Sequence, residues 1–511
     1  MRQILQQRLD GLSSATKPFS LMEYMRCGIE KEGLRITPAG FLAEAVYPQA
    51  LGSKLCNPVI TTDYSEALLE FITPALNHPQ KLLNWLQNLH QFTYKYLDNE
   101  VIWPASIPQT PYTAQHNIPI ADYGTSTLGK LKTIYRRGLG MRYGKEMQTI
   151  AGVHFNLSFS DPFWQNYQLL LTNNNSLTEF KNQQYLHLMR NIERYSWLLI
   201  YLTGASPFMS ANFLSTPFAT SLRSGDHGYQ TQTTVKMQAS LNSLEAYTND
   251  LYNALTTEHP AYAQIGLIEN NEYIQLNTNI LQLESEYYAR VRAKRNLHPK
   301  ESLLSALTTN GIEYIELRVF DLNPFMPLGI AKEDIIFIQI FALYALLTNS
   351  PDISPQEQNE INNNVLLTSQ KGRDPELTLT NNGHEQLLTS WAEEILTEVL
   401  AVAKFLDKNN LDNTINYTDS VMAKLETIFD PNKLFSARLL REMQEQSCDY
   451  GTLIMHYATQ HKTWLANMPE DATLQTEITK IAKQSIIEQK NIESALQENF
   501  EEYVGFKLGN Q

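Results

Sequence analysis

Polar and apolar residues alternate in several segments of the chain, as they do in a β-strand with one buried face. The clearest is "AGVHFNLSFS", residues 151–160, in which every second residue from Val153 is apolar. Residues 28–36, "GIEKEGLRI", and 311–321, "GIEYIELRVFD", also predict strands. Residues 66–74 predict another, although their spacing also fits a helix, and 273–292 predict one long or two broken strands.

Helical periodicity dominates other parts of the chain. Asn77 and Pro79 begin a predicted helix that ends near Leu97, and a second runs from about 177 to 202. Nearly all of the sequence after Pro327 predicts helix. The approximate ranges are 331–349, 384–408, 418–429, 433–446 and 473–502.

These elements predict an α+β fold with a mostly antiparallel sheet that has one polar face and is wrapped and followed by helices. No Gly/Ser-rich or Pro-rich linker marks a domain boundary. We therefore expect residues 1–511 to form a single catalytic unit. Its sheet-bearing core would span approximately 20–330, and a mainly helical part, 331–511, would pack on that core.

Charge and cysteine content narrow the class of protein. The net charge of −14, from 40 basic and 54 acidic residues, disfavours binding to nucleic acid or to anionic membranes. Local arginines and divalent cations can still hold a nucleotide on such a surface. The three cysteines, Cys27, Cys56 and Cys448, form no CxxC pair, which favours a reducing compartment over a disulfide scaffold or a structural zinc site.

No segment of the sequence predicts a signal peptide or a membrane span. The first residues, "MRQILQQRLDGLSS", are too polar for a signal peptide and predict a short amphipathic helix. The most apolar run, residues 334–347, is short of the roughly 20 residues that a bilayer requires. We expect a buried helix there and a cytoplasmic protein.

The strand at 28–36 carries two glutamates, Glu30 and Glu32, on the same face. Two neighbouring carboxylates repel each other, and if half-buried they need a cation. The strand is therefore either an exposed edge with an acidic face or one wall of a metal site. Signatures of P-loop, Rossmann, zincin and α/β-hydrolase enzymes are absent from the sequence.

Other predicted strands add polar residues opposite their apolar faces. If the strands are neighbours, these side chains converge into a basin of oxygen ligands with one imidazole, which suits Mg²⁺ and the phosphates of ATP. Taken singly, Glu30 or Glu70 favours a solvated strand face and His154 a hydrogen-bonded histidine, and Arg318 with Glu316 is consistent with a surface ion pair. Only their conjunction indicates a metal- and phosphate-binding enzyme. The residues are Glu30, Glu32, Asp63, Glu70, His154, Glu316 and Arg318.

Several strings closely resemble the proteobacterial type of the glutamate–cysteine ligase family, in the family's order from near residue 28 to about 443. They are "GIEKEGLRI", "ITTDYSEALLEFITP", "YGTSTLGKLKTIYRRGL", "RYGKEMQTIAGVHFNLS", "YLTGASP", "ATSLR", "LQLESEYYARVRAKR", "GIEYIELRVFDLNPF" and "FSARLLREM". The resemblance implies a glutamine-synthetase-like fold, in which a curved, mostly antiparallel sheet forms an active-site funnel. It gives no role to the last ~65 residues.

The resemblance also implies a reaction. ATP phosphorylates the γ-carboxylate of L-glutamate, and the amine of L-cysteine attacks the γ-glutamyl phosphate. The products are γ-glutamylcysteine, ADP and phosphate, in the first step of glutathione biosynthesis. The family implies two or three Mg²⁺ ions, with Mn²⁺ as an alternative, and a monomer.

Matched position by position, the resemblance assigns metal binding to Glu30, Glu32, Asp63, Glu70, His154 and Glu316. Asp63 could instead, or also, deprotonate the incoming ammonium. Arg136 and Arg318 match arginines around the transferred phosphoryl group, and Arg223 would bind either the phosphates or the glutamate carboxylate. The cysteine pocket would be lined by Tyr64, Tyr135, Leu139, Gln148, Tyr229 and Tyr288.

Three rival hypotheses remain open from the sequence. Tyr64 stands where the family is associated with phenylalanine, which leaves room for a related carboxylate–amine ligase with another acceptor. A catalytically silent binding protein would keep metal or nucleotide for regulation. A purely structural interaction protein would explain the helical C-terminal part but not the acidic strand faces.

Overall fold

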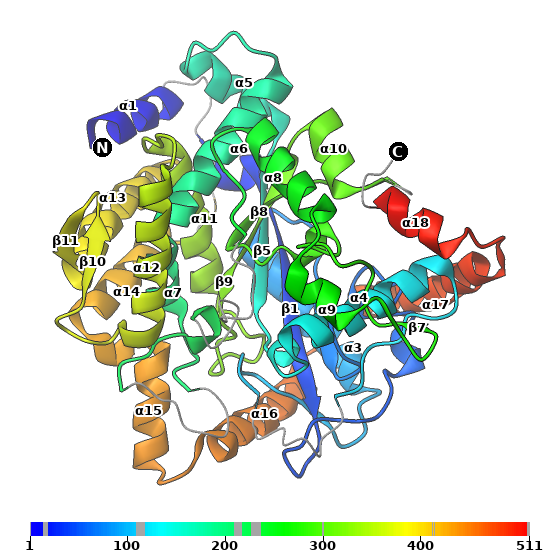
Figure 1. The fold of residues 1–511 in the computed structure, drawn as a ribbon. Helices are drawn as coiled ribbons and strands as arrows, with labels where there is room; N and C mark the ends of the chain where they lie inside the picture. Colours follow the sequence, from blue (N-terminus) through cyan, green and yellow to red (C-terminus); the bar gives the residue numbers. More distant parts are fainter. Residues whose placement is uncertain are drawn as a thin grey trace.

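The computed structural model describes residues 2–13, 19–108, 118–208, 217–225, 237–298, 301–410, 412 and 414–507. Its centre is a sheet with the strand order β2-β3-β1-β5-β9-β8, in which β4 also pairs with β1 (Figure 1). All of these pairings are antiparallel. The strands are β1 (Met25–Ile36), β2 (Ile60–Thr62), β3 (Leu68–Ile72), β4 (Val101–Ile102), β5 (Val153–Phe159), β8 (Val291–Lys294) and β9 (Tyr314–Phe320).

Helices surround this sheet (Figure 1). In the first two thirds of the chain they are α1 (Arg2–Ser13), α2 (Leu21–Tyr24), α3 (Pro79–Tyr94), α4 (Thr127–Tyr143), α5 (Asp161–Leu170), α6 (Leu177–Arg194), α7 (Ser196–Thr203), α8 (Leu244–Thr256), α9 (Pro260–Ile265), α10 (Leu303–Asn310) and α11 (Lys332–Leu347). The remainder are α12 (Pro355–Lys371), α13 (Leu388–Asn409), α14 (Tyr417–Phe429), α15 (Phe435–Glu445), α16 (Tyr450–Asn467), α17 (Ala472–Ser494) and α18 (Phe500–Lys507).

One face of the sheet is apolar and covered by helices α3 and α11. Alternate residues such as Phe155 and Leu317 point into this core and are fully buried. At the same face, Lys31 Nζ lies 3.0 Å from His90 Nε2 on α3, and Gln339 on α11 donates a hydrogen bond to Cys27 Sγ at 3.4 Å. The opposite face is therefore the one that carries the polar side chains.

Helix α11 contains the most apolar run of the sequence, and its residues from Asp334 to Leu347 are all buried. It packs between the sheet region and helices α13 and α14, as the sequence predicted for a core helix. Across the described part of the chain, no helix combines the length and the apolar character that crossing a membrane requires.

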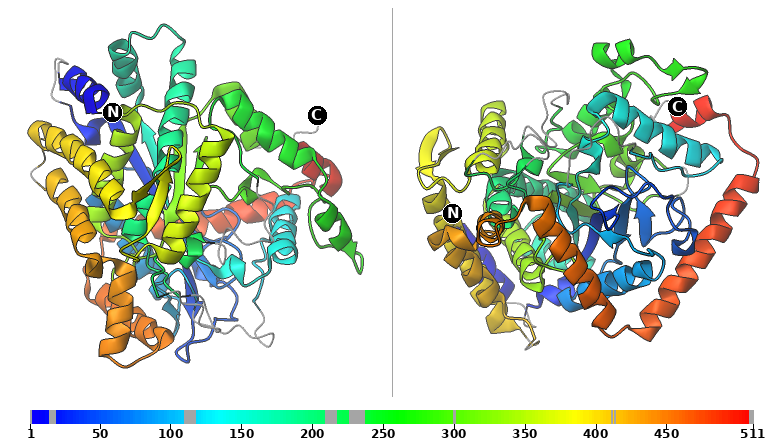
Figure 2. Two further views of the ribbon diagram at one scale, coloured as in Figure 1. Left: turned by 60° about the vertical axis from the view of Figure 1, so that its left-hand side comes forward. Right: turned by 90° about the horizontal axis from the view of Figure 1, so that it is seen from below.

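The C-terminal helices return to the N-terminal half. Helix α17 runs along α3 and the segment near residue 53, where Ser53 N donates a hydrogen bond to Ser485 Oγ at 2.9 Å (Figure 2, right). Helix α18 lies against α4, and just before it Glu498 O accepts a hydrogen bond from Thr127 Oγ1 at 3.0 Å. The two halves of the sequence thus share one packed interior.

The predicted α+β class with an antiparallel sheet is confirmed, but several predicted elements are wrong in extent. Residues 273–292 are mostly loop, with strand only at β7 (Glu272–Tyr273), which pairs with β6 (Ile268–Glu269), and at the start of β8. The helix expected over 177–202 is divided at Tyr195, which has φ −103° and ψ 11°. Helix α17 stops at Ser494 rather than near 502.

The helical part also contains a hairpin, and residues 384–387, at the start of the helix predicted over 384–408, form its second strand instead. Strands β10 (Thr378–Asn381) and β11 (His384–Leu387) meet at Asn382 and Gly383, both with positive φ. An Asn-Gly pair between two strands is a strong hairpin signal, because both residues tolerate that conformation. The sequence also did not predict eight of the helices described above: α2, α4, α5, α8, α9, α10, α12 and α16.

Candidate active site

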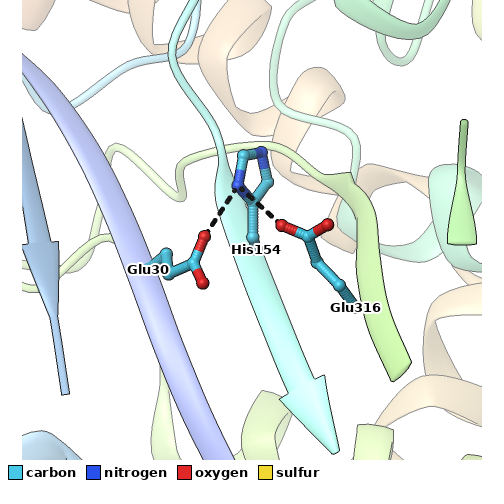
Figure 3. Close-up of side chains that lie close together, drawn as sticks. All are labelled: Glu30, His154 and Glu316. Atoms are coloured by element: carbon cyan, nitrogen blue, oxygen red, sulfur yellow. Dashed lines mark ion pairs between the residues drawn. The ribbon is translucent and has the colours of Figure 1, made fainter. Parts of the chain in front are cut away.

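Three neighbouring strands bring two carboxylates to one imidazole. Glu30 on β1, His154 on β5 and Glu316 on β9 form a group whose possible ligand atoms all lie within 4.8 Å of one another. His154 Nδ1 lies 3.4 Å from Glu30 Oε2 and 3.8 Å from Glu316 Oε1, between the two carboxylates (Figure 3). The convergence of strand faces that the sequence predicted is therefore present for these three residues.

Basic side chains surround Glu316. Arg318 Nη1 donates a hydrogen bond to Glu316 Oε1 at 3.1 Å and lies 3.2 Å from His154 Nδ1. Lys294 Nζ lies 3.6 Å from Glu316 Oε2, and Arg292 Nη1 lies 3.9 Å away. Burial opposes ionisation of Glu316, but Lys294, Arg318 and Arg292 outweigh it and hold its pKa well below the usual range.

A second acidic group lies farther along the same face. Glu32 and Glu70 are direct cross-strand partners on β1 and β3, and Asp63 follows β2. Burial, followed by the charges of Glu30, Asp63 and Glu32, raises the pKa of Glu70 well above its usual range. Burial likewise raises the pKa of Glu32, against the opposing effect of His154. This group carries more negative charge than its neighbours neutralise.

The donor set fits a hard divalent cation. Carboxylate oxygens with one imidazole are ligands that Mg²⁺ and Mn²⁺ accept. His154 Nε2 is buried, lies 3.8 Å from Glu32 Oε1 and has no hydrogen-bond partner among the described residues. A bound cation would give Glu32 and Glu70 the positive charge that their strand positions lack.

Backbone and amide groups hold the carboxylates of β1 in place. Asn156 Nδ2 donates a hydrogen bond to Glu30 Oε1 at 2.7 Å, and Gly152 N donates one to Glu32 Oε2 at 2.7 Å. Each glutamate keeps its other oxygen oriented toward His154. Charge-assisted hydrogen bonds of this kind fix a side chain before any ligand arrives.

Arg136 on α4 approaches the acidic face from the β2 side. Its Nε donates a hydrogen bond to Asp63 O, and its Nη2 lies 3.8 Å from Asp63 Oδ1. The guanidinium lies over the Tyr123 ring, 4.4 Å from its centroid, which fixes its plane. The Asp63 side chain is half-exposed, so it can meet a ligand from solvent.

Arg223 is fully buried beside the end of β9. Its Nη2 donates a hydrogen bond to Arg318 O at 3.3 Å, and its Nη1 lies 3.7 Å from Asp321 Oδ1. A Cβ at position 152 would collide with this guanidinium, so Gly152 allows it to lie against the start of β5. Asp321 also accepts hydrogen bonds from Ser206 Oγ at 2.6 Å and from other groups nearby.

The residues predicted to line a cysteine pocket gather around α4. Tyr135 and Leu139 lie on the helix, and Tyr64 packs against its Gly140. Tyr288 donates a hydrogen bond to Gln148 Oε1 at 2.9 Å, while Gln148 Nε2 is buried without a partner among the described residues. Tyr229 lies outside the described residues.

A cavity of about 400 Å³ opens beside these residues. Tyr143, Tyr288 and Arg318 line one side of it, and the ion pair of Glu193 with Arg290 lines another. Volumes of this order hold small-molecule ligands. The cavity therefore joins the tyrosines near α4 to an arginine of the acidic sheet face.

Comparison with known proteins places this arrangement in a family. The sequence model described as glutamate–cysteine ligase matches residues 10–367. The chain belongs to the glutamate–cysteine ligase family. This confirms the family that the sequence motifs predicted.

Individual members of the glutamate–cysteine ligase family match over nearly the whole chain. The chain is similar to glutamate–cysteine ligase from Alcanivorax borkumensis, with 40% identity over 98% of both chains, and to that from Pseudomonas fluorescens Pf0-1, with 37% identity over 99% of this chain and 97% of the relative.

Solved structures of related proteins agree. The crystal structure of glutamate–cysteine ligase from Francisella tularensis in complex with AMP superposes with a TM-score of 0.89 at 30% identity, covering 96% of this chain and 99% of that one. The crystal structure of a bifunctional glutathione synthetase from Pasteurella multocida superposes with a TM-score of 0.72 at 26% identity, covering 94% of this chain and 58% of that one.

Several residues of the site in this ligase-family chain were not among the predicted candidates. Lys294 and Arg292 face Glu316 from β8, Asn156 holds Glu30, and Asp321 holds Arg223. The alternation of polar and apolar residues in "VRAK", residues 291–294, and "VHFN", residues 153–156, indicates that Arg292, Lys294 and Asn156 lie on polar strand faces. The pairing of β8 with β9 is needed to show that the basic residues reach the acidic face.

Proposed function

We propose that this protein is an ATP-dependent ligase that joins the γ-carboxylate of L-glutamate to the amine of L-cysteine, giving γ-glutamylcysteine, ADP and phosphate. The observation that carries the proposal is the approach of Glu30, His154, Glu316 and Arg318 on one sheet face in a member of the glutamate–cysteine ligase family. The relative in complex with AMP supports adenine nucleotide as co-substrate.

The chemistry requires a better leaving group on the glutamate side chain. A carboxylate is a poor electrophile, and transfer of the γ-phosphoryl group of ATP gives an acyl phosphate whose leaving group is phosphate. Arg136 and Arg318 would bind the phosphoryl oxygens, and Arg223 would bind either these oxygens or the glutamate carboxylate, because guanidinium groups pair with both in bidentate fashion. Positioning and charge neutralisation then supply most of the rate enhancement.

Six residues would hold the divalent cations that accompany ATP. Two or three Mg²⁺ ions, or Mn²⁺, would cancel charge on the phosphate oxygens during transfer. The protein's part is to present carboxylates in fixed positions, as the hydrogen bonds from Asn156 and Gly152 do. The six residues are Glu30, Glu32, Asp63, Glu70, His154 and Glu316.

The acceptor amine must be neutral to attack. Asp63 is half-exposed at the edge of the acidic face, where it could take the proton from the incoming ammonium. Tyr64, Tyr135, Leu139, Gln148, Tyr229 and Tyr288 would line the acceptor pocket. The amine would then form the amide as the carbon–phosphate oxygen bond breaks.

A second candidate function keeps this chemistry and changes the acceptor. The hydroxyl of Tyr64 is buried and has no hydrogen-bond partner among the described residues. A free hydroxyl in the predicted pocket favours an acceptor with a polar side chain, and small pockets discriminate weakly between side chains of similar size. The acceptor is then another small amine or amino acid.

ADP release tests both functions. The purified protein is mixed with ATP, Mg²⁺ and L-glutamate, and L-cysteine, L-2-aminobutyrate, ammonia and no acceptor are compared. Turnover with cysteine and its thiol-free analogue, but little with ammonia, supports the ligase. Turnover with another amine alone supports the second candidate. ATP binding without turnover under every condition would overturn both and leave a silent binding protein.

The proposal also includes the setting in which the enzyme works. We propose a cytoplasmic monomer that acts on small molecules as a single catalytic unit, without nucleic acid or membrane partners. The net charge of −14 and the three scattered cysteines support this setting. Size-exclusion chromatography with light scattering tests the oligomeric state.

A further inference from the structure

We propose that Glu286 is a positioning residue for the acceptor amino acid. Through Arg142 and Tyr143 it would hold helix α4 against the segment that carries Tyr288, and so fix the pocket in which the acceptor binds. The proposal rests on the proposed function, because it takes the tyrosines around α4 as the acceptor pocket.

Glu286 and Arg142 form an ion pair whose side chains are both fully buried. Arg142 Nη1 lies 3.0 Å from Glu286 Oε1. The other nitrogens of Arg142 are also used: Nε donates to Gln275 Oε1 at 3.0 Å, and Nη2 donates to Asn277 O at 2.7 Å. A buried guanidinium whose three nitrogens all have partners is held in one orientation. Arg142 therefore fixes the C-terminal end of α4 to the loop over residues 275–286.

Tyr143 carries this constraint into the predicted pocket. Its hydroxyl donates a hydrogen bond to Glu286 Oε1 at 2.8 Å, the oxygen that Arg142 also contacts. The Tyr143 ring meets the Tyr288 ring edge to face, with centroids 5.8 Å apart and planes at 86°. Tyr288 in turn donates to Gln148 Oε1 at 2.9 Å. Tyr143 thus connects the ion pair to two predicted pocket residues, Tyr288 and Gln148.

The turn that contains Glu286 also holds the other side of the pocket. Gln282 Nε2 donates a hydrogen bond to Tyr135 O at 3.3 Å. Gln282 lies where a Cβ at Gly138 would be, so the helix and the turn are in close contact. Gln282 N donates to Glu286 Oε2, which joins this contact to the ion pair.

The contacts are concentrated on residues predicted to line the acceptor pocket. The turn and the ion pair together reach Tyr135, Tyr288 and, through Tyr288, Gln148. A buried hydrogen-bond network in which every side chain has a partner holds the residues of a site in fixed positions. Loss of the Glu286 charge should therefore displace the pocket as well as lower stability.

Steady-state kinetics of Glu286→Gln and Tyr143→Phe test the proposal. We expect the KM for L-cysteine to rise about tenfold in Glu286→Gln and about threefold in Tyr143→Phe, with the KM values for ATP and L-glutamate within about twofold of wild type. Because the two residues act in one chain of contacts, the double variant should be no worse than Glu286→Gln. Tyr143→Phe keeps the ring contact and decides the matter if Glu286→Gln does not fold.

A matched control separates positioning from stability. Asp334 and Lys424 form another nearly buried ion pair, 2.6 Å apart, on helices α11 and α14. Asp334→Asn should lower the Tm without changing the KM for L-cysteine. If Tyr143→Phe and Glu286→Gln lower the Tm but leave that KM unchanged, the positioning role is wrong.

A pocket variant distinguishes failure of this proposal from failure of the proposed function. Tyr288→Phe removes a group that would touch the acceptor itself. If it raises the KM for L-cysteine while the Glu286 and Tyr143 variants do not, the pocket stands and the positioning role is overturned. If none of the three changes that KM, the acceptor pocket lies elsewhere and both proposals fail. Wild-type protein that turns over ATP with no acceptor dependence overturns the proposed function first.

Discussion

Glu32 on β1 and Glu70 on β3 face each other directly across two hydrogen-bonded strands. Burial and neighbouring negative charges raise the pKa of Glu70 well above its usual value of 4.5, and burial raises that of Glu32. Like charges opposite each other destabilise a sheet. A cation at this face would neutralise the repulsion between the two carboxylates. Substitution of either residue therefore tests metal binding without a measurement of turnover.

Mg²⁺ should therefore raise the Tm of the wild-type protein more than an equal ionic strength of NaCl does. A ligand that binds only the folded state stabilises it by about 2.7 kcal/mol at 100 times its Kd. Glu70→Gln should weaken this response, measured by differential scanning fluorimetry. A wild-type Tm that responds equally to both salts would contradict a metal site here.

Glu70→Gln should also show a pH dependence in the absence of divalent cations. A carboxyl group whose pKa is raised in the folded state favours folding when protonated, so the wild type loses stability as pH rises through that folded-state pKa. The variant lacks this loss. It should be more stable than wild type near neutral pH and equal to it below about pH 4.3, where the carboxyl is protonated in both states. Urea unfolding in EDTA measures the difference.

Glu30→Gln and Glu316→Gln should both reduce ATP turnover by at least about 100-fold, the order of effect expected when a group acting on the transition state is lost. They should differ in stability. The amide at position 30 keeps a partner in Asn156, whereas the amide at 316 leaves Arg318, Arg292 and Lys294 without their counter-charge. Breaking a buried charge pair costs about 3–5 kcal/mol.

ADP release and circular dichroism measure these two effects. Glu245→Gln, at an exposed position on α8, is the control and should change neither the ADP release nor the stability. Normal turnover in either site variant would contradict the metal assignment of that residue.

Lys31→Met should raise the free energy of unfolding near neutral pH. Lys31 is buried on the apolar face of β1, beside His90 and the Phe71 ring, and burial lowers its pKa to about 7. An ammonium whose pKa is lowered in the folded state opposes folding when protonated. The penalty is therefore present below pH 7 and disappears as pH rises to the unfolded value of 10.5.

Each unit of pKa shift corresponds to about 1.4 kcal/mol, so the gain at pH 7 should reach a few kcal/mol and shrink toward pH 10. Urea titrations of variant and wild type at both pH values provide the comparison. A variant that is less stable than wild type at pH 7 would show that the pKa of Lys31 is not lowered in the folded protein, because its ammonium has a favourable partner.

Tyr64→Phe tests the departure at the predicted acceptor pocket. A buried hydroxyl without a partner costs about 1–3 kcal/mol, so its removal should raise the Tm. If the hydroxyl contacts the acceptor side chain, the variant should discriminate less between L-cysteine and L-2-aminobutyrate in kcat/KM. An unchanged ratio of kcat/KM for the two acceptors would place Tyr64 outside the pocket. Tyr47→Phe, which changes another buried tyrosine, serves as the control.

The strands that carry the site could be predicted because they alternate. The regions of β1, β5 and β9 each place polar residues opposite an apolar face, and the structure brings Glu30, His154 and Glu316 together as that pattern implies. The register was not predictable. The pairing of β5 with β9 shifts by one residue between Val153 and Phe155, so that Glu316 lies opposite Asn156 rather than Leu157. Single-sequence patterns do not specify such bulges.

The loop over 273–292 shows why the prediction of strand failed there. Ile274 and Leu276 are buried and two residues apart, which is the apolar spacing of a strand. The backbone, however, is held by side chains rather than by a neighbouring strand: Asn277 Oδ1 accepts from Asn279 N, and Gln282 Oε1 accepts from Leu276 N. Amide side chains that replace strand partners leave no signal in hydrophobic periodicity.

The return of α17 to the segment at Ser53 bears on how the chain folds during its synthesis. The two residues of the Ser53–Ser485 hydrogen bond are 432 positions apart in the sequence. Contacts this distant cannot form while most of the chain is still unmade, and such non-local closure slows folding. A nascent chain on the ribosome would therefore expose the acidic strands of the site before α17 can pack against the N-terminal half. It would have to avoid aggregation until the last helices are synthesised.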